Sequence, residues 1–380
     1  MSSSIYLDYN ATAPVRPQAA AAVARALEVG GNPSSVHAAG RAARAIMESA
    51  RESIARLIGA PAPDVVFTSG GAEANNLCLD SAVAAGSRRL IVSAIEHATV
   101  TETAKASPAE VEYLPVGRDG VADLGWLRER LAGWDAADGR PFVALMLANN
   151  ETGVIQPIAE AAEIVHAAGG WLHVDAIQAI GKIPVDFQAL GADTLTFSGH
   201  KLGAPQGVGG LAYGAGATLV RRQHGGGHER GRRAGTENVP GIAGLGAAAE
   251  AILTANADWS RHAAWRDAAA ERLKSVGAVV MGEGAPRTPN TLCVATPGWT
   301  SDLQLIALDL AGVMVSAGSA CSSGKVKASH VLVAMDQGDL ASCAIRVSGG
   351  WNTTEADWNR FADVWFEAYQ RFAARRKEVA

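Results

Sequence analysis

The chain has 380 residues, of which 48% are hydrophobic and 19% are charged. This length predicts two domains, or one large domain with an appendage, and the hydrophobic content is enough for a sizeable core and excludes wholesale disorder. A net charge of −5 and an aromatic content of only 6% argue against a protein that coats nucleic acid or an anionic membrane surface.

The sequence holds four cysteines, Cys78, Cys293, Cys321 and Cys343, and no CxxC pair. We therefore expect neither a zinc ribbon nor a thioredoxin-type site. Four cysteines are too few for a disulfide scaffold, so a reducing cytoplasm is the expected compartment. The first residues lack the basic and apolar regions of a secretory signal, and no apolar run is long enough to predict a membrane-spanning helix.

The first two thirds of the chain alternate short apolar runs with longer helical patterns. Continuous apolar strands separated by helices are typical of a parallel sheet that is covered on both faces. We therefore predict an α/β fold with a doubly wound, mostly parallel sheet. The expected strands are 65–67, 90–92, 111–114, 142–147, 171–174 and 194–197, and the expected helices between them are 72–85, 99–105 and 158–168.

The pattern changes after about residue 255. A long amphipathic helix at 259–276 is expected to cross between domains, and a smaller α+β unit follows it. We predict a large domain over 16–257 and a small domain that combines 1–15 with 258–380 and carries a mobile loop around Cys321. The expected elements of the small unit are strands 291–295 and 344–347 and helices 303–310 and 355–375.

Polar residues follow several of the predicted strands, and ligands of an open parallel sheet bind beyond the carboxyl ends of its strands. The turn at 69–72 opens a helix whose free N–H groups and dipole can seat a phosphate. An ordinary strand–helix turn is the alternative. Asn149 and Asn150 follow the strand at 142–147, either as turn formers or as amides that bind a ring substituent.

Three ionisable side chains also follow strands. Asp175, with Gln178 shortly after it, is either an N-cap or a carboxylate opposite a cation. Lys201 lies near the start of a glycine-rich stretch, 199–235, in which the backbone is expected to approach a ligand or another chain. This lysine is either exposed or held out of bulk water with a lowered pKa, available to form a Schiff base. His97 is either structural or lies over a bound ring.

These candidates together describe one cofactor. A phosphate seat, an anion for a pyridinium nitrogen, an amide for a ring oxygen and an amine for an aldehyde are the groups that bind pyridoxal phosphate. The carboxylate would keep the ring nitrogen protonated, so that the ring can accept electrons from a substrate carbanion.

A series of motifs supports this interpretation. Over essentially its whole length the chain resembles the cysteine desulfurases of the NifS/IscS type, within the class V aminotransferase group of fold-type I pyridoxal-phosphate enzymes. The spacing of 26 residues between Asp175 and Lys201 (201 − 175) also fits that family. The matching motifs, in family order, are YLDYNAT (6–12), NPSSVH (32–37), TSGGAE (68–73), EH (96–97), NNETG (149–153), HVDAIQ (173–178), SGHK (198–201), RAGT (233–236), GSAC (318–321) and RVS (346–348).

The resemblance implies a role for each cofactor residue. Lys201 would form the Schiff base, Asp175 would pair with the ring nitrogen, and His97 would stack on the ring or move protons. Gln178 and Asn150 would lie near the phenolic oxygen. The phosphate would be bound by Gly71, Ala72, Ser198, His200 and, from the neighbouring subunit of a homodimer, Thr236. Where the family usually has threonine this chain has Ala72, so one hydroxyl contact to the phosphate is missing.

The resemblance also implies the substrate site. Arg346, assisted by Asn32, would bind the carboxylate of the substrate as a bidentate fork. Cys321 would be the sulfur acceptor, and no metal is expected at the cofactor site, although Cys321 could contact a cluster or metal on a partner.

The surroundings of Cys321 support its role independently of the family. It lies in a run of small residues, 316–324, which predicts a mobile loop, and Lys325 and Lys327 favour the thiolate. An incidental loop cysteine is the alternative. The other three cysteines are expected to be buried.

The resemblance implies conversion of L-cysteine to L-alanine, with sulfur passed to Cys321 as a persulfide and then to an acceptor such as an iron–sulfur scaffold protein. Neither nucleic acid nor membrane is an expected partner. Two alternatives remain: another reaction on the same cofactor, such as that of a selenocysteine lyase or an aminotransferase, and a non-catalytic subunit with this fold. A nucleotide-binding domain is excluded because no glycine fingerprint follows the first strand.

Overall fold

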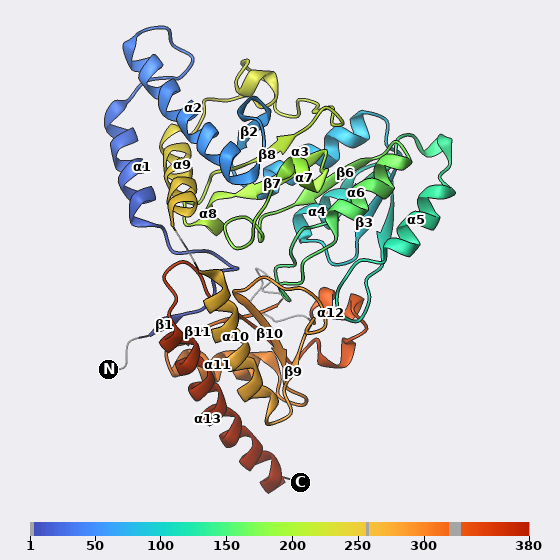
Figure 1. Cartoon of the computed structure of the whole chain (residues 1–380), viewed down its shortest axis with the longest axis vertical. Coiled ribbons are helices and arrows are strands. Elements are labelled where there is room, and N and C mark those ends of the chain that lie inside the picture. The colour runs from blue at the N-terminus through green and yellow to red at the C-terminus, as the bar shows by residue number, and fades with distance from the viewer. Residues whose placement is uncertain (1–3, 256–257, 319–327, 380) are drawn as a thin grey trace.

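The computed structural model describes residues 4–255, 258–318 and 328–379. Figure 1 shows a larger part above a smaller part, which holds the C-terminal helix. The larger part is built on a seven-stranded sheet with the order β2-β8-β7-β6-β5-β3-β4. These strands are β2 (Val65–Thr68), β3 (Arg89–Ser93), β4 (Glu110–Leu114), β5 (Phe142–Ala144), β6 (Trp171–Asp175), β7 (Thr194–Ser198) and β8 (Gly209–Tyr213).

Neighbouring strands of this sheet are parallel except at β8, which runs antiparallel to both β2 and β7. Every residue of β6 and β7 is buried, as expected for central strands that are covered on both faces. The predicted doubly wound, mostly parallel sheet is therefore confirmed.

Helices cover both faces of the larger sheet. Leu90 of β3 packs with α3 and α4, whereas its neighbour Ile91 belongs to a core that includes side chains of α2, α6 and α9. Successive side chains of a strand point to opposite faces, so these helix groups lie on opposite sides. The helices of the larger part are α1 (Pro17–Val29), α2 (Ala38–Ile58), α3 (Gly71–Ala84), α4 (Ala98–Ala106), α5 (Leu124–Ala132), α6 (Ile158–Ala167), α7 (Phe187–Leu190), α8 (Gly199–Leu202) and α9 (Val239–Thr254).

The structure corrects two expectations for the larger part. The strand predicted at 142–147 ends at Ala144, beyond which the chain is still buried but no longer pairs with β3. The glycine-rich stretch contains β8, a strand that the sequence did not predict. A Cβ at Gly209 would lie 2.7 Å from Gly70 Cα, and one at Gly210 would collide with the backbone of β2. The glycines thus permit a close approach within this chain.

The smaller part has a four-stranded antiparallel sheet with the order β12-β13-β10-β9, and β1 pairs with β11 in parallel. The predicted α+β architecture of the smaller part is therefore confirmed. The strands are β1 (Ile5–Tyr6), β9 (Val279–Val280), β10 (Thr291–Ala295), β11 (Val313–Met314), β12 (Ser316–Ala317) and β13 (Ala344–Ser348), and the helices are α10 (Trp259–Lys274), α11 (Ser301–Leu310), α12 (His330–Ala334) and α13 (Glu355–Val379).

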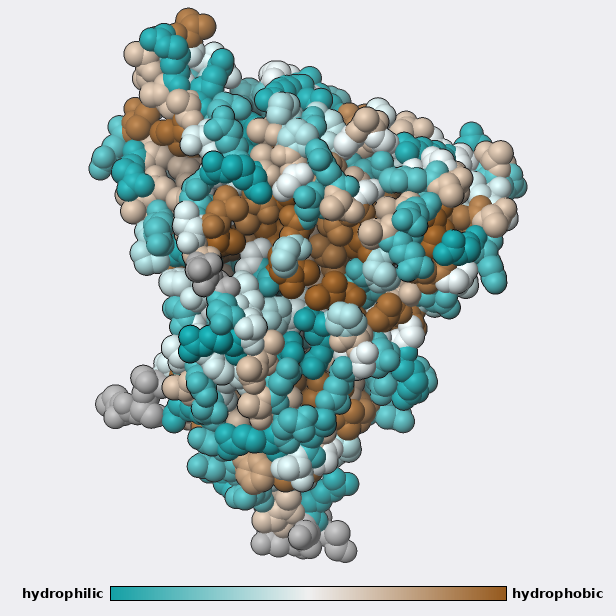
Figure 2. Space-filling model, viewed as in Figure 1, coloured by the Kyte–Doolittle hydropathy of each residue, from teal (hydrophilic) through white to brown (hydrophobic). Residues whose placement is uncertain are grey.

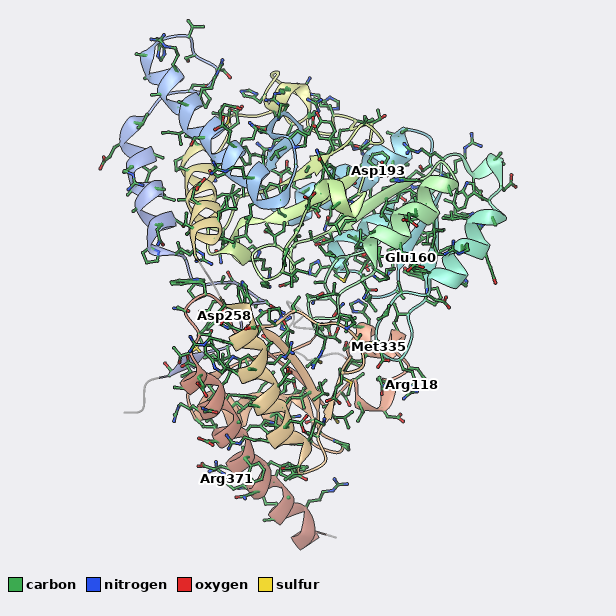
Figure 3. All side chains as sticks on the ribbon, viewed as in Figure 1. Arg118, Glu160, Asp193, Asp258, Met335 and Arg371 are labelled. Carbon is green, nitrogen blue, oxygen red and sulfur yellow. The ribbon has the colours of Figure 1, made fainter. Side chains whose placement is uncertain are left out.

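Most of the helix that was expected to cross between domains lies in the smaller part. Ala269 and Leu273 of α10 belong to the core that α13 shares, and Trp265 packs against it. Trp259, in the first turn of α10, instead borders a cavity that Ile180 and Ile252 of the larger part also line. The N-cap of α10, Asp258, marks in Figure 3 where the helix begins at the top of the smaller part. The domain boundaries at 16 and 258 stay a prediction, which the separate core of the smaller part supports.

A third apolar cluster joins the two parts. It contains Ile95 and Met146 of the larger part together with Cys293 and Met335 of the smaller one. Figure 3 shows Arg118, from the larger part, close to Met335 of the smaller part, and Arg118 forms an ion pair with Asp336. In Figure 2, hydrophobic side chains gather across the middle of the viewed face, whereas hydrophilic side chains cover most of the smaller part.

The expected burial of Cys78, Cys293 and Cys343 is confirmed, and each is a free thiol. Among the described residues, no helix combines the length and the apolar character needed to cross a lipid bilayer.

Candidate active site

A cavity of about 520 Å³ lies beyond the carboxyl ends of β6 and β7, where the larger and the smaller part meet. This is the position that an open parallel sheet predicts for a ligand. Most of its wall comes from the larger part, and β13 adds Arg346 from the smaller one. The predicted site residues that line it are Gly71, Ala72, His97, Asn150, Asp175, Gln178, Ser198, His200, Lys201 and Arg346.

Lys201 lies in α8, the single helical turn that follows β7. Its Nζ donates hydrogen bonds of 2.6 Å to the carbonyl oxygens of Asn10 and Ala11. Burial lowers the pKa of Lys201 to about 8, and the charge of Arg346 adds to this shift, while nearby carboxylates oppose it. The neutral amine, which is the nucleophilic form, is therefore populated near pH 8.

Asp175 ends β6 and is buried. Its Oδ2 accepts a hydrogen bond of 2.9 Å from Asn75 Nδ2, and its Oδ1 accepts one of 3.0 Å from the Ile177 N–H. Both oxygens are thus held by neutral donors, which fixes the carboxylate without neutralising it. Such a group can hold a proton on a ring nitrogen.

The turn before α3 has the properties of an anion seat. The helix begins at Gly71, and its N-cap, Gly70, provides no side chain to occupy the first N–H groups. A Cβ at Gly71 would collide with Ile177. Glu73 accepts from the Ser69 N–H at 2.8 Å and pairs with Arg233 at 2.8 Å, so its carboxylate occupies one N–H of the turn but not those of Gly71 and Ala72. The N–H groups at the start of α3 therefore remain for an anionic ligand.

Ser198 and His200 face the same cavity from the start of α8. His200 Nδ1 lies 3.2 Å from Thr12 Oγ1. Burial lowers the pKa of His200 to about 4, and Lys201 adds to the shift. His200 is therefore neutral at physiological pH and acts as a hydrogen-bonding group, not as a cation.

His97 is the N-cap of α4, and its Nδ1 accepts a hydrogen bond of 3.2 Å from the Thr99 N–H. The same nitrogen lies 2.9 Å from Thr99 Oγ1. Burial lowers the pKa of His97, and Asp175 opposes this shift. The histidine is therefore both a structural cap and a wall of the cavity.

The two asparagines at 149–150 have different roles. Asn149 is fully buried, and its Oδ1 accepts from the N–H groups of Glu151 and Thr152, each at 2.9 Å, as a turn former does. Asn150 lines the cavity, and its carbonyl oxygen accepts from Arg346 at 3.2 Å. The turn-former alternative is thus observed at Asn149, whereas binding of a ring substituent by the Asn150 amide stays a prediction.

Gln178 is held by two residues that the sequence did not single out. Its Nε2 donates to the carbonyl oxygen of Asn10 at 2.9 Å, and its Oε1 accepts from Lys182 Nζ at 2.5 Å. Lys182 Nζ also donates to Asn10 Oδ1 at 3.1 Å. Burial moves the pKa of Lys182 well below its ordinary value, and the charges of Lys201 and Arg346 add to this shift. Asn10 lies within a matched motif, but Gln178 and Lys182 are more than 150 residues away from it in sequence, so no local signal identified these contacts.

Arg346 is almost completely buried, with 5% of the residue exposed. It donates to Asp8 Oδ1 at 2.9 Å as well as to the Asn150 carbonyl. Its Nε has no partner among the described residues. A buried, charged donor without a partner at the wall of a cavity fits a ligand carboxylate.

Three predicted residues do not line this cavity. Asn32 lies on the exposed loop between α1 and α2, where its Oδ1 accepts from the Ser34 N–H at 2.8 Å, so within one chain it does not assist Arg346. Thr236 is exposed and borders a neighbouring cavity of about 110 Å³ that includes Ser69 and Arg233. Cys321 lies outside the described residues.

Comparisons with known proteins agree with this geometry. The family model described as Aminotransferase class-V matches residues 5–361. The chain belongs to the class-V aminotransferase family. It is 39% identical over 375 residues to a cysteine desulfurase IscS from Dictyoglomus turgidum, which covers 96% of this chain and 94% of that protein.

Two solved structures are similar to the whole chain. A NifS-like protein from Rickettsia africae is 32% identical with a TM-score of 0.88, covering 97% of this chain and 99% of that one. A protein described as SspA in complex with cysteine is 27% identical with a TM-score of 0.78, covering 90% and 98%. The chain thus has the fold-type I architecture that the sequence predicted.

Class-V aminotransferases and cysteine desulfurases are pyridoxal-phosphate enzymes, so the predicted cofactor is confirmed. The residues of the cavity fit this group. A lysine with a lowered pKa, a buried carboxylate, an uncapped helix N-terminus and an unpartnered arginine Nε lie around one cavity. These match an aldehyde, a ring nitrogen, a phosphate and a substrate carboxylate.

Proposed function

We propose that this chain is a cysteine desulfurase that converts L-cysteine to L-alanine. The C–S bond of the substrate breaks, and an S–S bond forms between the substrate sulfur and Cys321, which leaves a persulfide there. The observation that carries the proposal is the half-buried Lys201 with its lowered pKa, which faces the same cavity as Asp175 and Arg346. The chain is also 39% identical to a cysteine desulfurase over nearly its whole length. The structure described as a complex with cysteine supports the choice of substrate.

The residues of this chain would hold the cofactor from three sides. We assign the phosphate to Gly71, Ala72, Ser198 and His200, and the ring nitrogen to Asp175. Bound pyridoxal phosphate supplies an electron sink for the bond-breaking at the substrate Cα. Gln178 and Asn150 lie on the wall of the cavity, where they can bind a ring oxygen.

Lys201 has two tasks in this proposal. Its neutral amine anchors the cofactor covalently, and once released it is the base that removes the proton from the substrate Cα. Its lowered pKa suits both tasks, because an amine with a pKa near 8 exchanges protons readily at physiological pH. Arg346 binds the substrate carboxylate and so orients the Cα–H bond toward this amine.

We also propose that the chain works as a homodimer. α1 and the loop after it expose Leu27, Val29 and Val36, the last of them 87% exposed. Figure 2 shows hydrophobic side chains at this end of the molecule, near the tip of α1 and α2. A groove of about 520 Å³ between α1, α2 and α9 lies beside them. In a dimer, Thr236 would reach the partner's phosphate site, and light scattering of the purified protein tests the assembly.

We propose an iron–sulfur scaffold protein as the acceptor of the sulfur, because a similar protein carries the name IscS. The free thiols of Cys78, Cys293 and Cys343 support a reducing, cytoplasmic location.

Two measurements test the activity. Borohydride reduction followed by peptide mapping is expected to find a pyridoxyl group on Lys201. Incubation with cysteine is expected to give alanine and one added sulfur on Cys321, as read by mass spectrometry. Absence of the pyridoxyl group overturns the cofactor site, and alanine release without any persulfide in the wild type, or unchanged sulfide release by Cys321→Ala, overturns the role of Cys321. A preference for selenocysteine over cysteine would favour the lyase alternative.

A further inference from the structure

A buried hydrogen-bond network connects two sides of the candidate site. At its centre is Asn75 of α3, which is fully buried. Its Nδ2 donates to Asp175 Oδ2 and to Thr99 Oγ1, both at 2.9 Å. Its Oδ1 accepts from Thr196 Oγ1 at 2.7 Å and lies 3.1 Å from His173 Nε2.

The carboxylate of Asp175 determines how the Asn75 amide is oriented. If the amide were rotated by half a turn, its oxygen would face the carboxylate oxygen, and two acceptors would meet in a buried place. The Nδ2 group therefore faces Asp175. Each of its two hydrogens then has one acceptor, the first on Asp175 and the second on Thr99.

This orientation decides where the hydroxyl hydrogen of Thr99 lies. Because Thr99 Oγ1 accepts from Asn75, its own hydrogen is left for His97 Nδ1 at 2.9 Å. The Thr99 N–H donates to the same nitrogen at 3.2 Å. Two donors thus converge on Nδ1, which must be an acceptor. The neutral imidazole then carries its proton on Nε2.

A second proton on this ring, which is exposed in the protein without a ligand, would disturb the contacts of Nδ1. It would have to enter on Nδ1, where it would displace both donors of Thr99, next to the positive end of the α4 dipole. The charged groups around the ring are mostly cationic. Burial, Lys201, His330 and Arg346 lower the pKa of His97, and Asp175 alone opposes them.

We propose that Asn75 is a positioning residue that, through Thr99, fixes His97 as the Nε2–H tautomer, so that His97 offers the bound ligand a hydrogen-bond donor and not a base. The role toward the ligand rests on the proposed function. The tautomer itself does not, because the network exists in the protein alone.

The tautomer is tested by long-range ¹H–¹⁵N NMR of histidine-labelled protein, with and without the cofactor and with His97→Gln to assign the signals. The wild type is expected to show an unprotonated Nδ1 and a protonated Nε2. Thr99→Val and Asn75→Ala should both increase the population with the proton on Nδ1. The matched controls are Thr103→Val and Asn76→Ala. The native Thr103 hydroxyl donates only to the Thr99 carbonyl in the same helix, and the native Asn76 side chain donates to the Ala72 carbonyl. Both variants should leave the signals unchanged. A proton on Nδ1 in the wild type, or no change in either Thr99→Val or Asn75→Ala, overturns the proposal.

The role of the donor is tested by comparing two His97 variants that both remove the imidazole. His97→Gln keeps an N–H donor but cannot act as a base, whereas His97→Phe keeps only the ring. Loss of a general base costs about 10²–10⁴-fold in rate. We expect His97→Gln to keep alanine formation within about tenfold of the wild type and to exceed His97→Phe clearly, with an unchanged acid limb of the pH profile. Equal, large losses in both variants overturn the donor role. If borohydride trapping fails in the wild type, the proposed function fails, while the NMR result stands on its own.

Discussion

Arg346 and Asp8 form an ion pair of 2.9 Å across 338 positions of the sequence. Asp8 is itself held by Ser316, whose Oγ donates to its second oxygen at 2.7 Å. The pair therefore fixes one edge of the guanidinium, while its Nε has no partner among the described residues. Arg346 also lines the cavity, so the proposed substrate carboxylate would bind to a guanidinium that Asp8 already holds in place.

The planar guanidinium of Arg346, which we assign to the substrate carboxylate, leads us to expect weaker substrate binding in Arg346→Lys. Lysine keeps the charge but loses the planar set of donors, and the loss of a charge-assisted contact costs about 1.5–3 kcal/mol. We expect the KM for cysteine to rise about 10–100-fold with a smaller change in kcat, as measured by alanine formation. Arg272→Lys, at an exposed ion pair with Asp363, is the control and should leave KM unchanged. An unaltered KM in Arg346→Lys would contradict the assignment of the carboxylate site.

The lowered pKa of Lys201 predicts how cofactor attachment depends on pH. Only the neutral amine attacks the aldehyde, so the rate should rise about tenfold per pH unit below pH 8 and level off above it. A free lysine amine, with a pKa of about 10.4, should continue to rise well beyond that point. Stopped-flow absorbance of the apoprotein mixed with pyridoxal phosphate measures the rate of attachment at each pH. A rate that still rises tenfold per unit at pH 9 would show that Lys201 has an ordinary pKa.

Ala72 predicts a gain of affinity on substitution. It lies in the first turn of α3, is exposed and lines the cavity, so a larger side chain has room there. The hydroxyl of Ala72→Thr could donate to a bound phosphate, and one such contact is worth about 1.5–3 kcal/mol. We expect the Kd for pyridoxal phosphate to fall about tenfold or more, as titrated by absorbance. Ala72→Val, of the same shape without the hydroxyl, should not tighten binding.

The pair of Arg51 and Glu229 predicts a large loss of stability when it is broken. Glu229 accepts from Arg51 at 2.8 and 2.9 Å and from the Phe67 N–H at 2.9 Å, and both side chains are buried. Removing one partner of a buried pair costs about 3–5 kcal/mol, because the other charge is left without compensation. We expect Glu229→Ala to lower the denaturant midpoint strongly.

The matched comparison for Glu229→Ala is Glu250→Ala. Glu250 pairs with Arg56 on the surface, where such pairs are worth about 0–1 kcal/mol. Circular dichroism during denaturation compares the two variants. Glu229 lies seven residues before Thr236, and its bond to the Phe67 N–H connects that segment to β2. Similar small losses of unfolding free energy in both variants would mean that the Arg51–Glu229 pair does not stabilise this connection.

Lys182 predicts a pH dependence of stability. Its pKa in the folded protein is well below the ordinary 10.5, so between these two values the unfolded chain binds one more proton than the folded one. Stability should therefore rise with pH in this window, by about 1.4 kcal/mol per unit for this group. In Lys182→Met this contribution is absent, so the difference in unfolding free energy between wild type and variant should grow in favour of the wild type as the pH rises toward 10.5. A constant difference would show that Lys182 keeps its charge when folded.

Much of the fold could be predicted from local patterns. The apolar runs that became β2, β3, β6 and β7 lie within one or two residues of their predicted limits, because a strand buried on both faces needs an unbroken run of such residues. β8 was missed because its two glycines carry no apolar signal. They are required only by the approach of Gly70 and of the β2 backbone, which no local pattern reports.

The sequence by itself determined which chemical groups follow the strands, and hence that Asp175 and Lys201 meet at one edge of the sheet. Tertiary structure decided how those groups are tuned. The partners that orient Gln178 and Arg346, namely Lys182, Asn10 and Asp8, act through hydrogen bonds and charges over a few ångströms of space, and most of them are far apart along the chain. The same is true of Asn75, which connects Asp175 to His97 only because α3, β6 and α4 pack together. The local sequence gives the chemical identity of each site residue. The protonation and orientation of these residues depend on which groups the fold brings within hydrogen-bonding distance.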